Sequence, residues 1–277
     1  MISAYFHGEM GNNLFQLAAT LAHAKKLNVE TEFSYWRNFK VSVDQYPLEI
    51  PTMFDYKFNF TQTPKSTYEM YLHGDLQRTF EYTDIPMRDN LMLRGYFQSE
   101  KYFEDIKDEI KNKYFKPHPA VIDSLQNKWL NKHDFSNSLS IHLRIGHDRN
   151  LRGDNPQVEG LFPVCPVSYY VDAINRVLEM DDNISNIMCF SDDIGWCKEN
   201  MSSDEMIFIE GNTPVEDMFL MSMCKHNIIG NSTFSWWSAY LNKNVDRIVI
   251  VPETLWFGPQ LNYLNKKDLF LENWIKI

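Results

Sequence analysis

The residues best suited to bind a phosphate lie in the apolar segment 139–144, which has the composition of a β-strand. His142 and Arg144 are two positions apart, so a strand directs both side chains to one face and their apolar neighbours to the other. The planar guanidinium group of an arginine presents paired N–H donors that match phosphate oxygens. Arg144 is therefore a candidate phosphate ligand, with His142 beside it. The competing structural roles are an ion pair between Arg144 and Asp148, and a buried histidine.

A second group of polar residues follows a strand predicted over residues 227–229. It consists of an amide, two hydroxyls and an aromatic ring: Asn231, Ser232, Thr233 and Phe234. A helix predicted over 235–241 comes next, and hydroxyls together with the N–H groups at a helix start can bind phosphate. The simpler alternative is that Ser232 or Thr233 only caps this helix. The two tryptophans inside the helix are expected to pack rather than to bind a sugar.

Two adjacent carboxylates, Asp192 and Asp193, follow a strand predicted over 187–190. Guanine presents its N1–H and 2-amino donors side by side, which suits a single carboxylate. The alternative for one of the two is to cap the helix predicted over 194–200. A metal site would need more oxygen ligands than the sequence offers here, so no metal is expected.

The loop after the first predicted strand, residues 2–6, contains two glycines and an acidic residue. Its order is His7-Gly8-Glu9-Met10-Gly11-Asn12-Asn13. Glycine lets the backbone approach a ligand closely, and the next helix offers N–H groups at its start. Gly11 and Asn12 are therefore candidate ligand-binding positions, with Glu9 beside them. The loop has neither the lysine of a Walker motif nor the spacing of a dinucleotide fingerprint, so a tight strand-to-helix turn is an equal alternative.

These loops need strands and helices to bring them together. In the second half, strands are predicted over 139–144, 187–190, 206–209, 227–229 and 247–251, and helices over 167–178, 194–200, 213–224 and 235–241. Thr213 and Glu216 form a capping-box pattern around Pro214. Regular alternation of strands and helices is typical of a parallel, doubly wound sheet, whose ligands bind beyond the carboxyl ends of the strands.

The first half has the same character, although residues 35–90 show no clean period. Strands are predicted over 2–6 and 91–97, and helices over 14–27, over 100–113 and from Pro119 onward. Asn28 is the expected C-cap of the first helix. Because 277 residues correspond to about two domains, we expect two facing Rossmann-like α/β domains, 1–125 and 126–277, with a cleft between them.

The composition excludes several classes of protein. The chain is 44% hydrophobic and 23% charged, which is typical of a globular protein, and its net charge of −10 argues against nucleic-acid binding through overall charge. The four cysteines form no C-x-x-C pair. No apolar run approaches the ~18 residues of a membrane span, and no signal peptide is recognisable. We therefore expect a soluble, cytoplasmic protein in which any phosphate is held by a few local donors.

Several segments, spread over nearly the whole chain, match a known pattern: 11–16, 95–103, 190–193 with Trp196, 217–227, 231–237 and 256–257. Together they resemble the α-1,2-fucosyltransferases of glycosyltransferase family 11. This resemblance implies a GT-B fold whose C-terminal domain holds most of the donor. It also implies inverting transfer of L-fucose from GDP-β-L-fucose, without a metal or other cofactor, to a galactose-terminated oligosaccharide at its 2-OH. The acidic charge balance favours a neutral oligosaccharide over an anionic polymer as this acceptor.

The resemblance also implies roles for individual residues. Arg144 is expected to contact the β-phosphate, assisted by Ser232, Thr233 and the helix start. His142 and one of Asp192 and Asp193 are expected to hold the ribose and guanine. The remaining implied donor-binding residues are Gly11, Asn12, Asp148, Asn231 and Phe234.

Two departures from the family pattern bear on the acceptor. Ile145 and His147 stand where members usually carry the second arginine and the aspartate of H-x-R-R-G-D, so this segment is more similar to the H-x-R-x-G-x-D motif of protein O-fucosyltransferases. Glu9 replaces a common glycine and is a candidate general base, with His7 and Asp148 as alternatives. The competing functions are a protein O-fucosyltransferase and a non-catalytic protein that binds sugar nucleotides or glycans.

Overall fold

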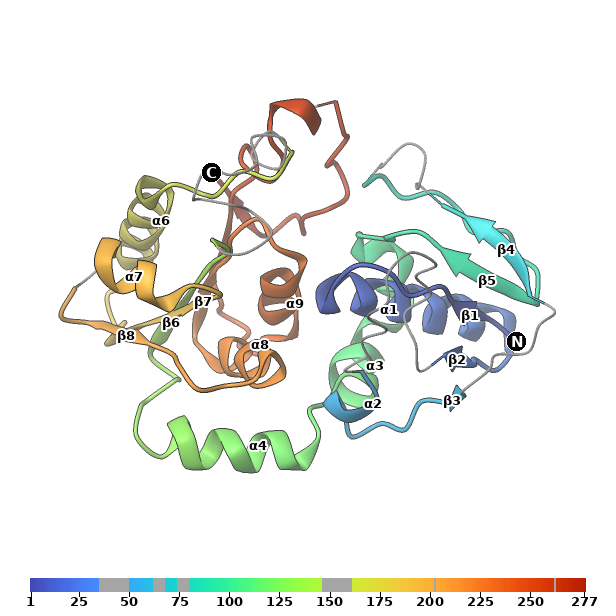
Figure 1. Cartoon of the computed structure of the whole chain (residues 1–277), viewed down its shortest axis with the longest axis horizontal. Coiled ribbons are helices and arrows are strands. Elements are labelled where there is room, and N and C mark those ends of the chain that lie inside the picture. Colours follow the sequence, from blue (N-terminus) through green and yellow to red (C-terminus); the bar gives the residue numbers. More distant parts are fainter. Residues whose placement is uncertain (35–49, 62–67, 74–79, 146–160, 202, 262) are drawn as a thin grey trace. The chain divides into compact units, whose positions relative to one another are not determined.

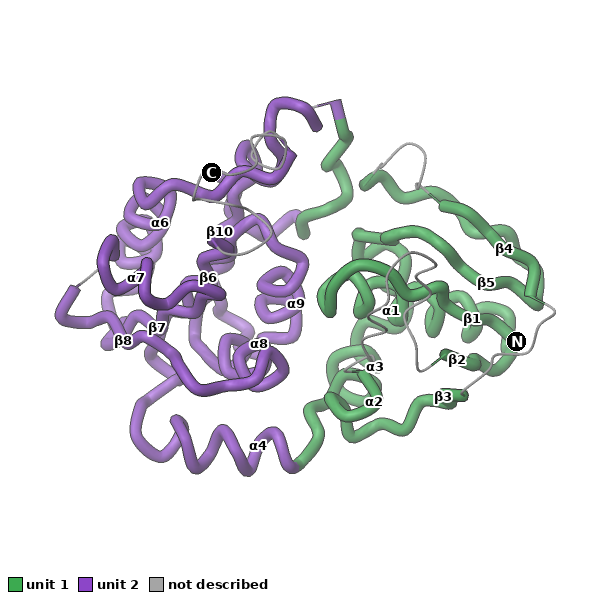
Figure 2. Tube along the Cα trace, viewed as in Figure 1, with its two compact units in different colours: residues 1–119, 264–271 green, residues 120–263, 272–277 purple. Residues whose placement is uncertain are grey.

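The chain forms two compact units. The computed structural model describes residues 1–34, 50–61, 68–73, 80–145, 161–201, 203–261 and 263–277. One unit comprises Met1–Pro119 and Leu264–Leu271, and the other comprises Ala120–Tyr263 and Glu272–Ile277 (Figure 2). The end of the chain thus contributes to both units, a feature that is absent from the predicted contiguous division.

The N-terminal unit is built on a parallel sheet, with the order β1–β5–β4 among the described residues (Figure 1). Its strands are β1 (Ser3–Ala4), β4 (Glu69–Leu72) and β5 (Leu91–Arg94), and a separate parallel pair is formed by β2 (Phe33–Ser34) and β3 (Phe60–Thr61). Because β1 and β5 are neighbours and run the same way, the loops that follow them lie at one edge of the sheet.

The first helix, α1 (Met10–Leu27), begins earlier than the predicted Leu14 and ends where predicted. The expected cap is confirmed: Asn28 has a left-handed backbone, with φ 54°, and its N–H donates to the carbonyls of Ala24 and Lys25. The early start places Gly11 and Asn12 inside the first turn of α1. A second, short helix of this unit is α2 (Ile50–Met53).

The single helix predicted over 100–113 is wrong. The structure has 3₁₀ turns at Glu100–Tyr102 and Glu104–Ile106, the short helix α3 (Lys107–Glu109) and a π turn at Ile110–Tyr114. Phe103 and Ile106 are buried, with φ angles of −136° and −124° that lie outside the helical range. Packing of these two side chains therefore overrides the local helical pattern.

The C-terminal unit contains a parallel sheet of six strands in the order β11–β10–β9–β6–β7–β8. The strands are β6 (Ser138–Leu143), β7 (Asn186–Ser191), β8 (Met206–Phe208), β9 (His226–Ile228), β10 (Val249–Val251) and β11 (Ile275–Lys276). The helices are α4 (Pro119–Leu125), α6 (Val167–Met180), α7 (Ile194–Asn200), α8 (Pro214–Met223) and α9 (Thr233–Leu241), with a π turn at Gln126–Leu130 and a 3₁₀ turn at Pro259–Leu261. The predicted parallel, doubly wound sheet is confirmed.

The side chains of β6 alternate between the two faces of the sheet, as predicted. Three apolar residues are buried in a core with residues of α6 and α7: Leu139, Ile141 and Leu143. His142 points to the opposite face, where its ring centroid lies 5.4 Å from that of Phe234 in α9. The strand therefore separates an apolar core on one side from the candidate ligand group on the other.

The predicted capping box at the start of α8 is confirmed. The Thr213 hydroxyl accepts the N–H of Glu216 at 3.2 Å, and the Glu216 carboxylate accepts the N–H of Thr213 at 2.6 Å. Glu216 also accepts from the Lys128 ammonium at 2.9 Å and from the Ser124 hydroxyl. Burial raises the pKa of Glu216, but these hydrogen bonds outweigh burial and lower it to about 2. The start of α8 is thus filled by protein groups.

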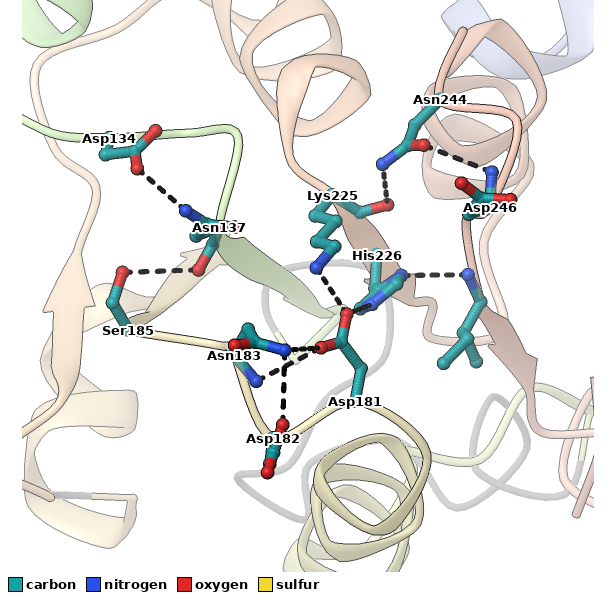
Figure 3. Close-up of polar contacts among 11 residues, drawn as sticks. Asp134, Asn137, Asp181, Asp182, Asn183, Ser185, Lys225, His226, Asn244 and Asp246 are labelled. Carbon is teal, nitrogen blue, oxygen red and sulfur yellow. Dashed lines mark hydrogen bonds and ion pairs between the residues drawn. The ribbon is translucent and has the colours of Figure 1, made fainter.

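A largely buried ion cluster lies at the amino end of the C-terminal sheet (Figure 3). Asp181, at the end of α6, accepts from Lys225 Nζ at 2.5 Å and from His226 Nε2 at 2.9 Å. His226 Nδ1 accepts the N–H of Ile248 at 2.9 Å, so the imidazole is neutral with its proton on Nε2. Burial lowers the pKa of His226, and the hydrogen bonds from Lys225 and His226 hold the pKa of Asp181 well below its usual range.

Replacing Asp181 with asparagine should lower the free energy of unfolding by about 2 kcal/mol at neutral pH, because charge-assisted hydrogen bonds are lost. Folding lowers the pKa of Asp181, so its contribution is present above the unfolded value of about 3.9 and is lost as the pH falls below it. The difference from the wild-type protein should therefore shrink in strong acid. Folding also lowers the pKa of His226, which removes stability from both proteins below about pH 6.5.

Chemical denaturation over a series of pH values measures this difference. The matched control is Asp182→Asn, since Asp182 is exposed and bonds only its neighbour Asn183 among the contacts described. The control should change stability by less than about 0.5 kcal/mol. An Asp181→Asn protein as stable as the wild type at neutral pH contradicts the assigned role.

Candidate functional site

The strand order of the C-terminal sheet brings the predicted ligand loops together. β6 lies between β7 and β9, and its pairing with β9 ends at Ile141–Ile228, whereas its pairing with β7 continues through His142 and Leu143. The chain thus leaves β6 toward β7 on one side, and β9 is added later on the other side. Ligands of open α/β sheets bind at such a switch point, beyond the carboxyl ends of the strands.

Arg144 extends from the carboxyl end of β6 beside Asp192. Its Nη1 lies 3.4 Å from Oδ2 of Asp192, and the two side chains are 28% and 25% exposed. The other Asp192 oxygen, Oδ1, accepts the N–H of Ile145 at 2.8 Å. Asp192 therefore holds both the backbone and the guanidinium group at the end of β6. The competing partner considered from the sequence, Asp148, lies outside the described residues.

His142 is buried, with 5% of its surface exposed, and its ring contacts Phe234. Its carbonyl oxygen accepts the hydroxyl of Tyr170 at 3.1 Å. The structure thus brings together the two residues singled out at the end of β6 and one from the start of α9.

Asp193 has a structural role as the cap of α7. Its Oδ1 accepts the N–H of Trp196 at 3.0 Å, and its own N–H donates to the Ser191 hydroxyl. The expectation that one of the two adjacent carboxylates caps a helix is therefore confirmed. Adjacent residues of the same type have different partners: Asp192 is bonded to the end of β6, and Asp193 is bonded to the helix that follows.

Asn231 ties the loop after β9 to two other segments. Its side-chain amide donates to the carbonyls of Pro163 at 2.7 Å and Leu255 at 2.9 Å. Ser232 occupies the N-cap position of α9, yet its side chain accepts no hydrogen bond from the helix, so the simpler capping role fails for this residue. Thr233 and Phe234 follow and are half-buried.

The tandem tryptophans of α9 pack in the interior, as expected. Trp236 and Trp237 are fully buried. Trp236 stacks on Tyr240 with ring centroids 4.9 Å apart and also contacts Trp274 at 5.3 Å. These rings anchor α9 and so fix the position of its first turn.

The predicted loop of the N-terminal unit is a tight turn into α1. Gly8 has φ +75°, and a Cβ there would lie 2.4 Å from Nδ2 of Asn12, so the turn requires glycine. Asn12 Oδ1 accepts from Gln98 Nε2 at 2.7 Å, which joins the loop after β1 to the loop after β5. Glu9 is exposed at the N-cap position of α1 and does not cap the helix, and Gly11 is buried in its first turn.

Sequence reasoning missed several residues that hold these groups in place. Gln16 donates from Nε2 to the His7 carbonyl at 3.1 Å and accepts the His7 N–H at 3.2 Å, so it fixes the loop after β1. Tyr169 and Tyr170 bond the carbonyls at the ends of β9 and β6. Gln16 lies in a motif quoted for the family, whereas nothing in the helical pattern of 167–178 distinguishes the two tyrosines.

Two kinds of feature are missing from the described part of the chain. It contains no group of three or more His, Cys, Asp or Glu residues that could hold a metal ion. None of its helices combines the length and the apolar character needed to cross a membrane.

Comparison with known sequences identifies relatives along the whole chain. The Glycosyl transferase family 11 model matches residues 1–277. An Alpha-1,2-colitosyltransferase of Escherichia coli is 35% identical over 199 residues, which cover 69% of this chain and 64%, less than two thirds, of that protein. The O-antigen biosynthesis glycosyltransferase WbnK of Escherichia coli is 28% identical over 310 residues, covering 98% of both chains.

Solved structures share the fold at low sequence identity. The fucosyltransferase NodZ from Bradyrhizobium superposes with a TM-score of 0.54 at 10% identity, covering 86% of this chain and 91% of that one. POFUT1 in complex with GDP superposes with a TM-score of 0.55 at 13% identity, covering 87% and 93%.

The parallel α/β units, with polar loops at the carboxyl ends of their strands, define a glycosyltransferase of the GT-B fold. The chain belongs to glycosyltransferase family 11, as the match over its whole length shows. This confirms the resemblance identified from the separate sequence segments and the predicted fold class.

Replacing Asp193 with alanine should lower the free energy of unfolding by about 1 kcal/mol, because the start of α7 loses its cap. Asp193→Asn is the matched control, since asparagine caps a helix nearly as well but removes the charge. Urea denaturation of the three proteins measures the effect. Equal stability of Asp193→Ala and the wild type would show that the cap contributes nothing.

Proposed function

We propose that this protein is an inverting fucosyltransferase that moves L-fucose from GDP-β-L-fucose to a sugar hydroxyl, without a metal. The observation that carries the proposal is the proximity of the Arg144 segment to the loop that begins α9. A Cβ added at Gly230 would lie 3.7 Å from the backbone nitrogen of Arg144. Gly230 comes two residues before Ser232, the N-cap of α9. A guanidinium group and a helix start at one strand edge suit a diphosphate.

The proposed reaction is a single displacement at the anomeric carbon. The acceptor oxygen forms a bond to this carbon from the face opposite the nucleotide, while the bond from carbon to the β-phosphate oxygen breaks and its electron pair leaves with GDP. Negative charge therefore grows on the diphosphate in the transition state. Fixed donors at that position give the largest electrostatic stabilisation, and we assign this role to Arg144 with Ser232, Thr233 and the N–H groups of α9.

The remaining donor contacts follow from the same edge of the sheet. We assign the ribose and guanine to His142 and to Asp192 or Asp193, and place Asn231 and Phe234 along the same pocket. One carboxylate oxygen of Asp192 accepts the Ile145 N–H, so Asp192 can also position Arg144 for the diphosphate. Asp148 belongs to the proposed set through its motif alone, because it lies outside the described residues.

We assign the acceptor to the N-terminal domain, taken as 1–125, and the donor to the C-terminal domain, taken as 126–277. Gly11 and Asn12 are the proposed contacts to the donor from the N-terminal side. The proposed acceptor is a neutral, galactose-terminated oligosaccharide that accepts fucose on its 2-OH. Support for the linkage comes from the α-1,2 in the name of the colitosyltransferase relative.

The colitosyltransferase relative raises a competing donor for the same site. Mass spectrometry of products from GDP-fucose or GDP-colitose, each with an array of galactosides, separates the two activities. Nuclear magnetic resonance of the product identifies the new linkage. Binding of GDP-fucose without release of GDP would instead indicate a non-catalytic binding protein.

Replacing Arg144 with alanine should reduce the rate of transfer at least about a hundredfold, because a fixed donor to the leaving diphosphate contributes about 3 kcal/mol. Arg144→Lys should recover only part of the rate, since an ammonium group lacks the planar fork. GDP release measures the rate, and circular dichroism checks the fold. The control is Arg176→Ala, whose side chain is 54% exposed on α6 and bonds only Glu179 among the contacts described. A folded Arg144→Ala protein with most of its activity would sink the assignment.

Replacing Glu9 with glutamine tests the proposed general base. If Glu9 accepts the proton of the acceptor hydroxyl, the variant should lose most of kcat. The matched control is Glu30→Gln, an exposed glutamate beyond the other end of α1, which should keep the wild-type kcat. A Glu9→Gln protein with the wild-type kcat removes Glu9 from the mechanism.

A further inference from the structure

Two adjacent buried tyrosines of α6 bond the ends of the two strands that part at the switch point. The Tyr170 hydroxyl donates to the His142 carbonyl at 3.1 Å, one residue beyond the last residue of β6 that pairs with β9. The Tyr169 hydroxyl donates to the carbonyl of Ile229 at 2.7 Å, directly after β9. Each hydroxyl therefore donates to the carbonyl of one strand end, beyond the last residues that pair between β6 and β9.

Gly230 fills the narrow space between these two strand ends. A Cβ at this residue would lie 2.8 Å from the His142 carbonyl oxygen and 3.0 Å from the Tyr170 hydroxyl. The Tyr170 oxygen thus bonds the backbone that leads to Arg144 and also occupies the space beside Gly230, where a side chain on the backbone that leads to Ser232 would otherwise lie. Its ring is fixed by a perpendicular contact with Tyr169, with centroids 4.8 Å apart.

We propose that Tyr170 is a positioning residue for the nucleoside-diphosphate donor: its hydroxyl sets the separation between the end of β6, which carries Arg144, and the start of α9. The inference rests on the proposed function, because it assigns the diphosphate to these two elements. Tyr170 does not touch the donor. It acts through the His142 carbonyl and through Gly230, with Tyr169 fixing the Ile229 side of the gap.

The hydroxyl is suited to this role because it is a permanent donor. Tyr170 is 1% exposed, and its burial keeps the pKa well above the usual value, so the proton stays on the oxygen throughout the working pH range. Phenylalanine would keep the ring and its packing but leave the His142 carbonyl without this donor. The separation between the end of β6 and Gly230 would then no longer be set by this hydrogen bond.

The experiment compares Tyr170→Phe with the wild type for binding of GDP by calorimetry and for steady-state transfer. We expect a roughly tenfold rise in the dissociation constant of GDP and a similar fall in kcat/KM for the sugar nucleotide, as for loss of a buried hydrogen bond. The KM for the acceptor should stay unchanged. A purely structural role would lower the melting temperature and leave GDP affinity at the wild-type value, which overturns the proposal.

The matched control is Ser138→Ala, at the opposite end of the same strand. Its buried hydroxyl donates to the Phe135 carbonyl at 2.9 Å, so the variant loses a comparable hydrogen bond far along β6 from His142. This variant should be less stable than the wild type but should bind GDP with unchanged affinity. If Ser138→Ala and Tyr170→Phe weaken the binding of GDP equally, a general loosening of the sheet explains both results, and the proposal is wrong.

A second variant keeps the proposal testable if Tyr170→Phe folds poorly. Gly230→Ala adds a methyl group against the His142 carbonyl and the Tyr170 hydroxyl. It should therefore also weaken the binding of GDP. In the double variant one of the two close contacts is removed, so the two effects should be clearly less than additive. Fully additive effects would show that the residues act separately and would overturn the proposal. If the wild-type protein binds no GDP at all, the proposed function fails instead.

Discussion

The site depends on one constraint, which is that all strands of the C-terminal sheet run in the same direction. Their carboxyl ends therefore lie at one edge, and the loops after β6, β7 and β9 meet there although they are far apart in the chain. β6 is the first strand of this unit and has later strands on both sides. Pairing of β6 with β9 ends at Ile141, whereas pairing with β7 continues to Leu143, so the end of β6 lies at the switch point of the sheet.

The charge distribution explains how an acidic chain can accommodate a phosphate. The net charge of −10 says little about a site in which Arg144 is only 28% exposed and meets Asp192 at 3.4 Å. A partly exposed ion pair of this kind adds little stability. Asp192 is also held by the Ile145 N–H, so the carboxylate is fixed at the end of β6 independently of its contact with Arg144.

Two helix starts in the same unit differ in how their first turns are capped. The start of α8 is closed by the reciprocal bonds of Thr213 and Glu216, with Lys128 neutralising the carboxylate. At the start of α9, the Ser232 side chain makes no such bond, although serine is a good capping residue. The ion cluster around Asp181 lies at the amino end of the sheet, away from the carboxyl ends of its strands.

Local sequence signals predicted the elements whose ends are decided by nearby residues. Asn28 and the Thr213–Glu216 pair act within one helical turn, so their roles follow from the sequence alone. The failure over 100–113 has the opposite origin: Phe103 and Ile106 leave the helical conformation and are buried, and the Phe103 ring packs on Phe15, which is distant in the chain.

By itself the sequence determined the residue types at the strand ends and the parallel fold that brings them to one edge, because alternation and periodicity are local properties. Only the tertiary structure decided which of two equivalent residues does what. Asp192 bonds the end of β6 while Asp193 caps α7, and Tyr170 reaches the His142 carbonyl. These assignments depend on distances of about three ångströms, which are set by the packing of whole helices on the sheet rather than by neighbours in the chain.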